Sequence, residues 1–202
     1  MRRTRSRSKA FTLIELMIVV ALIAIIVTLA APSFRDMILM QRLRGINAQL
    51  VTDLAFARSE AVSRGTFMQV RFQTSSTSSP PMSCYIIFAR KDAVTSDMCD
   101  CLEAAGSRCS APTLTTEVKT VQAPVSESVR FDIPTSRLPY FTIDPRTGGV
   151  WVASIPENVN APTFVVETLI DPARRFRNLY RLSGQLSVCT PSGSTVGGPA
   201  CS

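Results

Sequence analysis

The sequence contains no histidine, and this absence excludes several kinds of catalytic site. A Ser-His-Asp triad and a Cys-His pair both need an imidazole as their general base. The glycine-rich fingerprint of dinucleotide-binding proteins and the Walker P-loop are also missing. The acidic residues are scattered, and no two of them have a spacing that favours general acid-base catalysis. We therefore expect a protein that is not an enzyme and that holds no cofactor.

Acidic residues are fewer than basic ones, and the excess has a local origin. The chain of 202 residues carries 22 Lys and Arg against 15 Asp and Glu, a formal charge of +7. The first ten residues contain no acid and five of the basic side chains: Arg2, Arg3, Arg5, Arg7 and Lys9. Removing this leader leaves 17 basic and 15 acidic side chains, or +2. The basic balance therefore indicates a targeting segment and not a nucleic-acid-binding surface.

A long apolar run follows the basic leader. Residues 11–31 read FTLIELMIVVALIAIIVTLAA, with Glu15 as the single charge. A helix over this run is about 30 Å long, enough to cross a bilayer, and the basic flank places the N-terminus in the cytoplasm. An ionised carboxylate in lipid costs at least about 2.5 kcal/mol, so Glu15 indicates a positive partner within an assembly. The alternatives are an uncut signal anchor and a secretory signal peptide, although no A-x-A-type cleavage site follows promptly.

The leader and the start of this run resemble the class III signal of type IV pilins and pseudopilins. The resemblance lies in a basic leader, the small residue Ala10 (where most members have Gly) and the string FTLIEL from Phe11. It implies that a prepilin peptidase cuts between Ala10 and Phe11 and that the new amino group of Phe11 is methylated. It also implies that Glu15 meets the N-terminal amine of a neighbouring subunit during filament assembly.

A second stretch resembles the GspH/FimT group of pseudopilins and minor pilins. Residues 50–65 read LVTDLAFARSEAVSRG, and the segment ARSEA at 57–61, followed by Arg64-Gly65, carries the likeness. We expect Arg58 and Glu60 to lie on an exposed helix face. In FimT-type minor pilins, a C-terminal Gly-Arg-x-Arg pattern is associated with DNA binding. The matching place here, GQLS at 184–187, lacks both arginines.

The pattern beyond residue 31 predicts a long helix followed by strands. Pro32 ends or kinks the helix. An apolar stripe beyond it favours a kink, with a helix that resumes near Ser33, bends again at Gly45 and stops at Gly65: Leu43, Ile46, Leu50, Leu54, Ala57 and Ala61. We expect strands at 67–72, 85–89, 114–121, 129–133, 164–170 and 178–188, and a hairpin at 141–154 with Trp151 in the core. The fold class is α+β, a long kinked helix packed on an antiparallel β-sheet head as in pilins.

Six cysteines lie beyond the apolar run, on the side of the membrane predicted to be oxidising: Cys84, Cys99, Cys101, Cys109, Cys189 and Cys201. An even number there indicates disulfides, although their pairing does not follow from the count. We expect Cys189 to pair with Cys201, and Cys99 and Cys101 each to reach Cys84 or Cys109. The alternative is a metal site made of thiolates, but with no histidine and an oxidising compartment we expect none.

One basic cluster is a candidate nucleic-acid site. Arg174, Arg175, Arg177 and Arg181 lie in DPARRFRNLYR, with Phe176 and Tyr180 between them. Arginine and aromatic side chains together suit phosphate contact and base stacking. The competing interpretation, which we favour, is a solvated turn between two strands.

The sequence thus predicts a minor pilin or pseudopilin of a type II secretion pseudopilus or a type IV pilus, placed near the filament tip. Its expected partners are other subunits, the prepilin peptidase, the inner-membrane assembly platform and the bilayer. A DNA-binding minor pilin and a non-polymerising adhesin head are the alternatives. We expect four segments: a removed leader (1–10), a membrane-crossing half-helix (11–31), a periplasmic half-helix (32–65) and a β-rich head with a flexible C-terminal tail (66–202).

Overall fold

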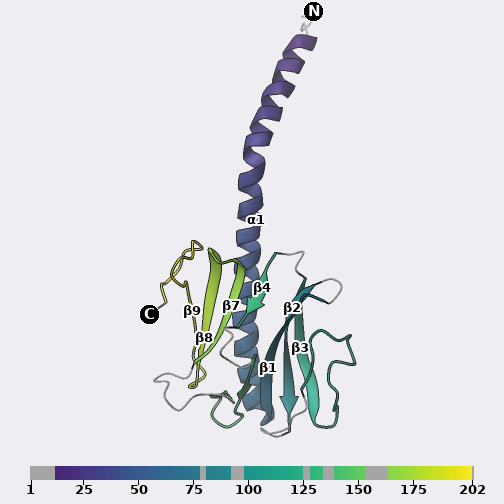
Figure 1. The fold of residues 1–202 in the computed structure, drawn as a ribbon, viewed down its shortest axis with the longest axis vertical. Helices are drawn as coiled ribbons and strands as arrows, with labels where there is room; N and C mark the ends of the chain where they lie inside the picture. The colour runs from purple at the N-terminus through teal and green to yellow at the C-terminus, as the bar shows by residue number, and fades with distance from the viewer. Residues whose placement is uncertain are drawn as a thin grey trace, which may run out of the picture. The chain divides into compact units, whose positions relative to one another are not determined.

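The computed structural model describes residues 12–77, 81–91, 98–124, 128–133, 139–152 and 163–201, apart from the side chains of 29–33 and 163. Within these residues one long helix precedes nine strands, which pair antiparallel (Figure 1). The chain divides into two compact units, Met1–Ile38 and Leu39–Ser202, which we call the N-terminal unit and the C-terminal unit. The predicted α+β class is confirmed.

Helix α1 spans Leu13–Arg64. At its start the hydroxyl of Thr12 accepts a hydrogen bond from the backbone N–H of Glu15 (3.3 Å), and the order Thr-x-x-Glu is that of a capping box. The helix continues through Pro32 and Gly45, so the interpretation that Pro32 ends it is wrong.

The C-terminus of α1 lies where the sequence predicts it. Gly65 has a φ of 62°, a backbone conformation that glycine adopts without a steric penalty. The N–H of Thr66 then donates to the carbonyl of Ala61 (3.3 Å), which is the long bond of a Schellman cap. The helix stop at Gly65 is therefore confirmed.

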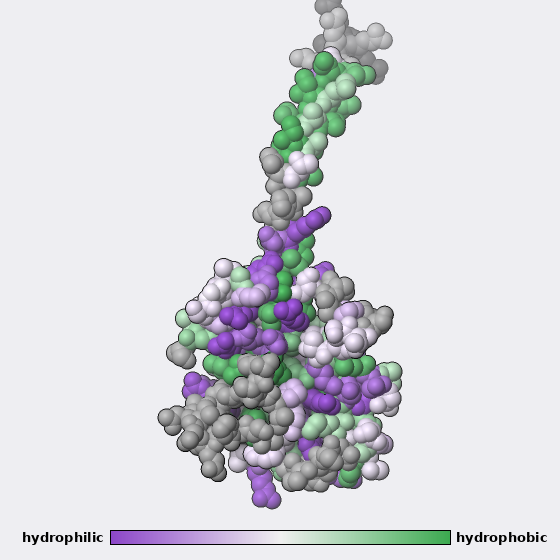
Figure 2. All heavy atoms as spheres, in the orientation of Figure 1, coloured by the Kyte–Doolittle hydropathy of each residue, from purple (hydrophilic) through white to green (hydrophobic). Residues whose placement is uncertain are grey.

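In the N-terminal unit the large apolar side chains of α1 are exposed, from Leu13 to Val27. They form the green surface of this helical segment in Figure 2. The sequence predicts a membrane crossing at 11–31. Among the residues that the structure describes, no helix is long and apolar enough to cross a membrane.

The strands of the C-terminal unit form two sheets. The first has the order β3-β2-β1-β5-β6 and the second the order β4-β7-β8-β9. The first sheet contains β1 (Phe67–Ser75), β2 (Met82–Arg90), β3 (Thr115–Pro124), β5 (Tyr140–Ile143) and β6 (Val150–Trp151). The second contains β4 (Arg130–Asp132), β7 (Thr163–Asp171), β8 (Arg174–Arg181) and β9 (Leu186–Cys189).

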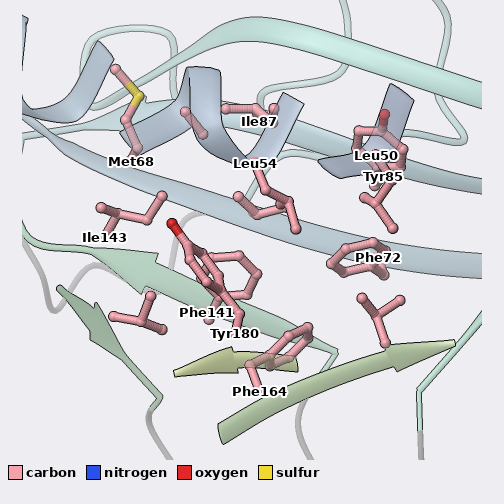
Figure 3. Close-up of a cluster of buried hydrophobic side chains, with 14 of the residues drawn as sticks. Leu50, Leu54, Met68, Phe72, Tyr85, Ile87, Phe141, Ile143, Phe164 and Tyr180 are labelled. Carbon is pink, nitrogen blue, oxygen red and sulfur yellow. The ribbon is translucent and has the colours of Figure 1, made fainter. Parts of the chain in front are cut away.

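The main core of the C-terminal unit lies between α1 and the inner faces of both sheets (Figure 3). The predicted apolar stripe of the helix is buried: Leu43, Leu50, Leu54, Ala57 and Ala61 are fully buried, and Ile46 is partly buried. Aromatic rings of the two sheets pack on each other. The ring centroids of Phe72 (β1) and Phe164 (β7) are 5.8 Å apart, and those of Phe141 (β5) and Tyr180 (β8) are 5.0 Å apart. The apolar period of the helix is therefore confirmed as a packing surface.

A disulfide-bonded segment covers part of the outer face of the first sheet. Cys84 of β2 is bonded to Cys101, and Cys99 to Cys109, so Cys99 and Cys101 do not bond each other. Below this segment Ile86 and Phe88 are fully buried. Arg71 of β1 also donates to the carbonyl of Cys99 (3.0 Å).

The segment after β9 packs on the second sheet, where the sequence predicts a flexible tail. Cys189 is bonded to Cys201, and Val196 is buried against Leu43 of α1. The hydroxyl of Ser194 donates to the carbonyl of Arg175 (2.8 Å). The tail is therefore part of the packed C-terminal unit.

The expected position of Trp151 is wrong. Its side chain is 50% exposed, because Trp151 lies on the short edge strand β6 and points to the outer face of the sheet. The neighbouring Val150 and Val152 are the buried members of this hairpin.

Candidate functional site

The processing residues Ala10 and Phe11 lie outside the described residues. Glu15 is described, and it lies exposed in the first turn of α1. A carboxylate there is favoured by the helix dipole, and the backbone N–H of Glu15 donates to the capping hydroxyl of Thr12. Local helix chemistry therefore gives Glu15 a stabilising role that the sequence analysis missed, although the spacing Thr-x-x-Glu signals it.

The four arginines of the basic cluster lie on a strand and not on the predicted turn. β8 begins at Arg174 and ends at Arg181, after a two-residue turn from β7. Arg175 and Arg177 therefore project from one face of the second sheet.

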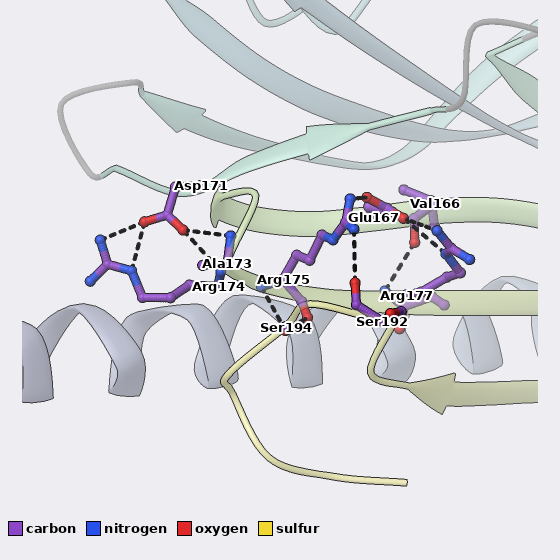
Figure 4. A network of polar contacts seen from close by, with 10 residues as sticks. Val166, Glu167, Asp171, Ala173, Arg174, Arg175, Arg177, Ser192 and Ser194 are labelled. Carbon is purple, nitrogen blue, oxygen red and sulfur yellow. Dashed lines mark hydrogen bonds and ion pairs between the residues drawn. The ribbon is translucent and has the colours of Figure 1, made fainter. Parts of the chain in front are cut away.

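Acidic side chains of β7 neutralise most of this cluster (Figure 4). Glu167 accepts from Arg175 at 3.3 Å and from Arg177 at 2.7 Å. Asp171 binds Arg174 at 2.7 Å, and this hydrogen bond holds the pKa of Asp171 below its ordinary value. Arg181 is exposed and has no acidic partner among the described residues. Three of the four arginines thus belong to ion pairs within the sheet.

The aromatic side chains of the cluster are turned away from Arg175, Arg177 and Arg181. Tyr180 is 2% exposed and lies in the main core, and Phe176 packs on the cluster of Leu43, Val129 and Val196. The expectation that Phe176 and Tyr180 stand beside the arginines for base stacking is therefore wrong. The signal was present, since residues 176, 178 and 180 share one face of a strand and 175, 177 and 181 share the other.

We expect this surface to bind DNA weakly. Phosphate contacts by Arg175 and Arg177 would compete with Glu167, and the two rings of the cluster are packed inward, Tyr180 in the main core and Phe176 on the cluster around Leu43. A titration of the chain with a short duplex at 50 and 200 mM salt checks this. A steep loss of affinity with salt that disappears in Arg175→Ala/Arg177→Ala/Arg181→Ala would contradict it.

The sequence predicts Arg58 on an exposed helix face, but in the structure its side chain is partly buried. Its guanidinium donates to the carbonyl of Gly184 at 3.1 Å and approaches that of Ser183 at 3.5 Å, both in the turn between β8 and β9. On its other side it lies against Gly148 in the loop between β5 and β6. Beside it, the N–H of Val150 donates to the carbonyl of Leu182 (2.8 Å). Arg58 therefore joins the two sheets to the helix.

Asp53 is a second polar residue of the helix that is not part of the predicted apolar stripe and is nevertheless buried. It is 3% exposed, and its carboxylate accepts from the Tyr85 hydroxyl and from Lys119 Nζ, both at 2.7 Å. Burial and the neighbouring Asp53 raise the pKa of Tyr85 well above its ordinary value. The helix is thus held to the first sheet by a buried polar contact. No local signal reveals it, because the partners lie 32 and 66 residues away.

Tyr180 gives the C-terminal unit a sensitivity to alkali. Burial raises its pKa to about 12, against an opposing effect of Arg58, and its hydroxyl has no partner among the described residues. A folded-state pKa above the unfolded value of about 10 stabilises the fold below pH 10, and this contribution is lost as the pH rises towards 12.

We expect Tyr180→Phe to leave the free energy of unfolding at pH 7 unchanged or slightly higher, because it removes an unsatisfied buried hydroxyl. Between pH 9.5 and 11 the free energy of unfolding of the variant should fall less steeply with pH than that of the unsubstituted chain. The two slopes should differ by up to about 1.4 kcal/mol per pH unit. Urea denaturation followed by Trp151 fluorescence measures both quantities. A loss above about 2 kcal/mol at pH 7 would show that the hydroxyl makes a strong hydrogen bond.

Two family models match the chain. The model of the prokaryotic N-terminal methylation motif matches residues 5–31. The model described as type II transport protein GspH matches residues 47–178, which is most of the chain. The chain belongs to the GspH family. No curated protein and no solved structure gives a significant match.

Membership of the GspH family makes the chain a minor pilin or pseudopilin with a type IV prepilin-like N-terminus. The matched GspH region begins in α1 at the buried Asn47 and ends in β8 at Asn178, and these two side chains are hydrogen-bonded to each other (2.8 Å). The family is one of structural subunits and not of enzymes. Its N-terminal motif fits anchoring in the inner membrane followed by entry into a periplasmic filament.

Proposed function

We propose that this GspH-family chain is a minor pseudopilin placed near the tip of a type II secretion pseudopilus. The prepilin peptidase removes residues 1–10, Phe11 is methylated, and residues 11–31 anchor the subunit in the inner membrane until the assembly platform adds it to the filament. The matched family, described as type II transport protein GspH, supports the secretion pseudopilus over a type IV pilus.

The observation that carries the proposal is the isolated charge of Glu15. It is the only charged residue between positions 10 and 34, and the apolar side chains around it are exposed along α1. A surface of this kind is stable when other apolar helices or lipid cover it. A carboxylate covered in this way needs a cation as its partner. The methylated amine of Phe11 in a neighbouring subunit supplies one at the N-terminal end of the helix, where Glu15 lies.

The test separates this charge from the capping role of Glu15. Glu15→Gln keeps the capping box but removes the charge, whereas Thr12→Ala removes the cap and keeps the charge. We expect Glu15→Gln to be inserted and cut normally but to co-purify with the other pseudopilins at least about ten-fold less, since a charge-assisted hydrogen bond contributes about 1.5–3 kcal/mol. Thr12→Ala should assemble nearly normally.

Normal assembly of Glu15→Gln would overturn the proposed pairing. The identity of the co-purified subunits decides the machine. Crosslinking of the parent chain to secretion pseudopilins supports the proposal, and crosslinking to pilus subunits alone would assign it to a type IV pilus.

A further inference from the structure

The outer face of the first sheet is only partly covered. The disulfide-bonded segment lies over β2, where Ile86 and Phe88 are buried. At the other edge, β5 and β6 carry the half-exposed Trp151 and, next to it in the strand register, Thr142. Directly paired residues of antiparallel strands point to the same face, so these two side chains stand together.

Two adjoining hollows occupy this part of the C-terminal unit. One has a volume of about 250 Å³ and is lined by Phe67, Thr142, Asp144 and Trp151. The other has a volume of about 530 Å³ and adds Gly65, Pro145 and Arg146 to the shared residues Phe67 and Asp144. Together they have the size of a small-molecule site.

Thr142 is the feature that points to a ligand. Its side chain is 1% exposed and lines the smaller hollow, yet its hydroxyl has no partner among the described residues. A buried hydroxyl without a hydrogen bond is unfavourable, and native structures rarely keep one without a reason. A ligand group in the hollow would satisfy it.

Asp144 supplies a fixed acceptor beside this hydroxyl. Its Oδ1 accepts the backbone N–H groups of Arg146 (2.7 Å) and Thr147 (3.0 Å), which hold the pKa of Asp144 below its ordinary value. The carboxylate is therefore charged at neutral pH and its orientation is set by the turn. This charge disfavours phosphates and other anions in the smaller hollow, which Arg146 does not line.

The geometry points to a sugar-binding site in which a ring of a neutral oligosaccharide stacks on Trp151 and Phe67 and hydrogen-bonds to Thr142 and Asp144. A sugar ring has an apolar C–H face for the aromatic side chains and hydroxyl groups for the carboxylate and the threonine. A purely apolar ligand would leave both polar groups without partners. The site belongs to the C-terminal unit alone, so it does not depend on the proposed filament assembly.

Trp151 is the only tryptophan of the chain, so its fluorescence reports directly on this site. The experiment titrates the full chain, in a detergent without a sugar headgroup, with the trisaccharides of N-acetylglucosamine and of glucose. We expect a saturable change in Trp151 emission. Calorimetry should show about three- to ten-fold weaker binding in Thr142→Val, which keeps the shape and removes the hydroxyl. It should show a loss of about ten-fold or more in Trp151→Ala.

Leu114→Ala, which removes a partly exposed apolar side chain outside the hollows, is the matched control and should bind like the parent. The urea midpoint of each variant shows whether it is folded. Absence of a signal with both trisaccharides at millimolar concentration would overturn the proposal. Binding that is unchanged in Thr142→Val and Trp151→Ala would also overturn it. A Trp151 response to a purified pseudopilin, without one to sugars, would instead make the hollows a subunit interface.

Discussion

Gly184→Ala should destabilise the C-terminal unit by about 2–5 kcal/mol, from backbone strain plus overpacking. Gly184 has a φ of 77°, where a side chain is strained. A Cβ there would clash with the backbone carbonyl oxygen of Gly148 and would lie 2.8 Å from Arg58 Cζ. The oxygen belongs to the backbone of the neighbouring loop, so this clash is relieved only by moving that loop away from the turn, whereas the second contact is relieved by displacing Arg58.

Gly193→Ala is the matched control for this prediction. Gly193 has a similar φ of 80°, but nothing lies within 4 Å of its added Cβ. Its cost should therefore be the backbone strain alone, about 1–2 kcal/mol. Urea denaturation of the full chain in detergent, followed by Trp151 fluorescence, measures both variants. Equal losses would show that the contact with Arg58 and Gly148 contributes nothing.

Asp53→Ala should destabilise the same unit by about 2–4 kcal/mol. The change leaves the buried Tyr85 hydroxyl without its acceptor, which costs about 1–3 kcal/mol, and opens a small cavity under α1. Lys119 contributes less, because its side chain is 40% exposed and reaches water when its partner is lost.

Two further variants identify the source of this loss. Asp53→Asn retains an acceptor for Tyr85 and should cost clearly less than Asp53→Ala. In the double variant Asp53→Ala/Tyr85→Phe, neither polar group remains, so part of the stability should return. If the double variant were less stable than the sum of the two single changes predicts, the hydrogen bond would not be the main contribution.

The sequence predicts the helix of this fold better than its sheets. The apolar period from Leu43 to Ala61 and the stop at Gly65 are local patterns, and the structure confirms both. The sequence places β8 too late in the chain, because its arginines obscure the alternation of the partly buried Phe176 with the buried Asn178 and Tyr180. Their neutralising partner, Glu167, comes from the neighbouring strand, and sequence spacing does not show strand pairing.

The polar residues of the helix were predicted least well. Arg58 and Asp53 lie off the apolar stripe, and a helix face with charges usually faces water. Here Arg58 meets glycine turns 90 and 126 residues further along the chain. These contacts depend on the final arrangement of two sheets, which no local pattern encodes.

The overlapping disulfides of the first sheet have a consequence for cleavage by proteases. Cys99–Cys109 encloses residues 100–108, and Cys84–Cys101 ties the start of that segment to β2. A single cut anywhere between residues 102 and 108 therefore leaves both pieces covalently joined. The cleaved chain would migrate as one species until its disulfides are reduced. The disulfide-bonded segment over Ile86 and Phe88 would stay covalently attached on both sides of the cut.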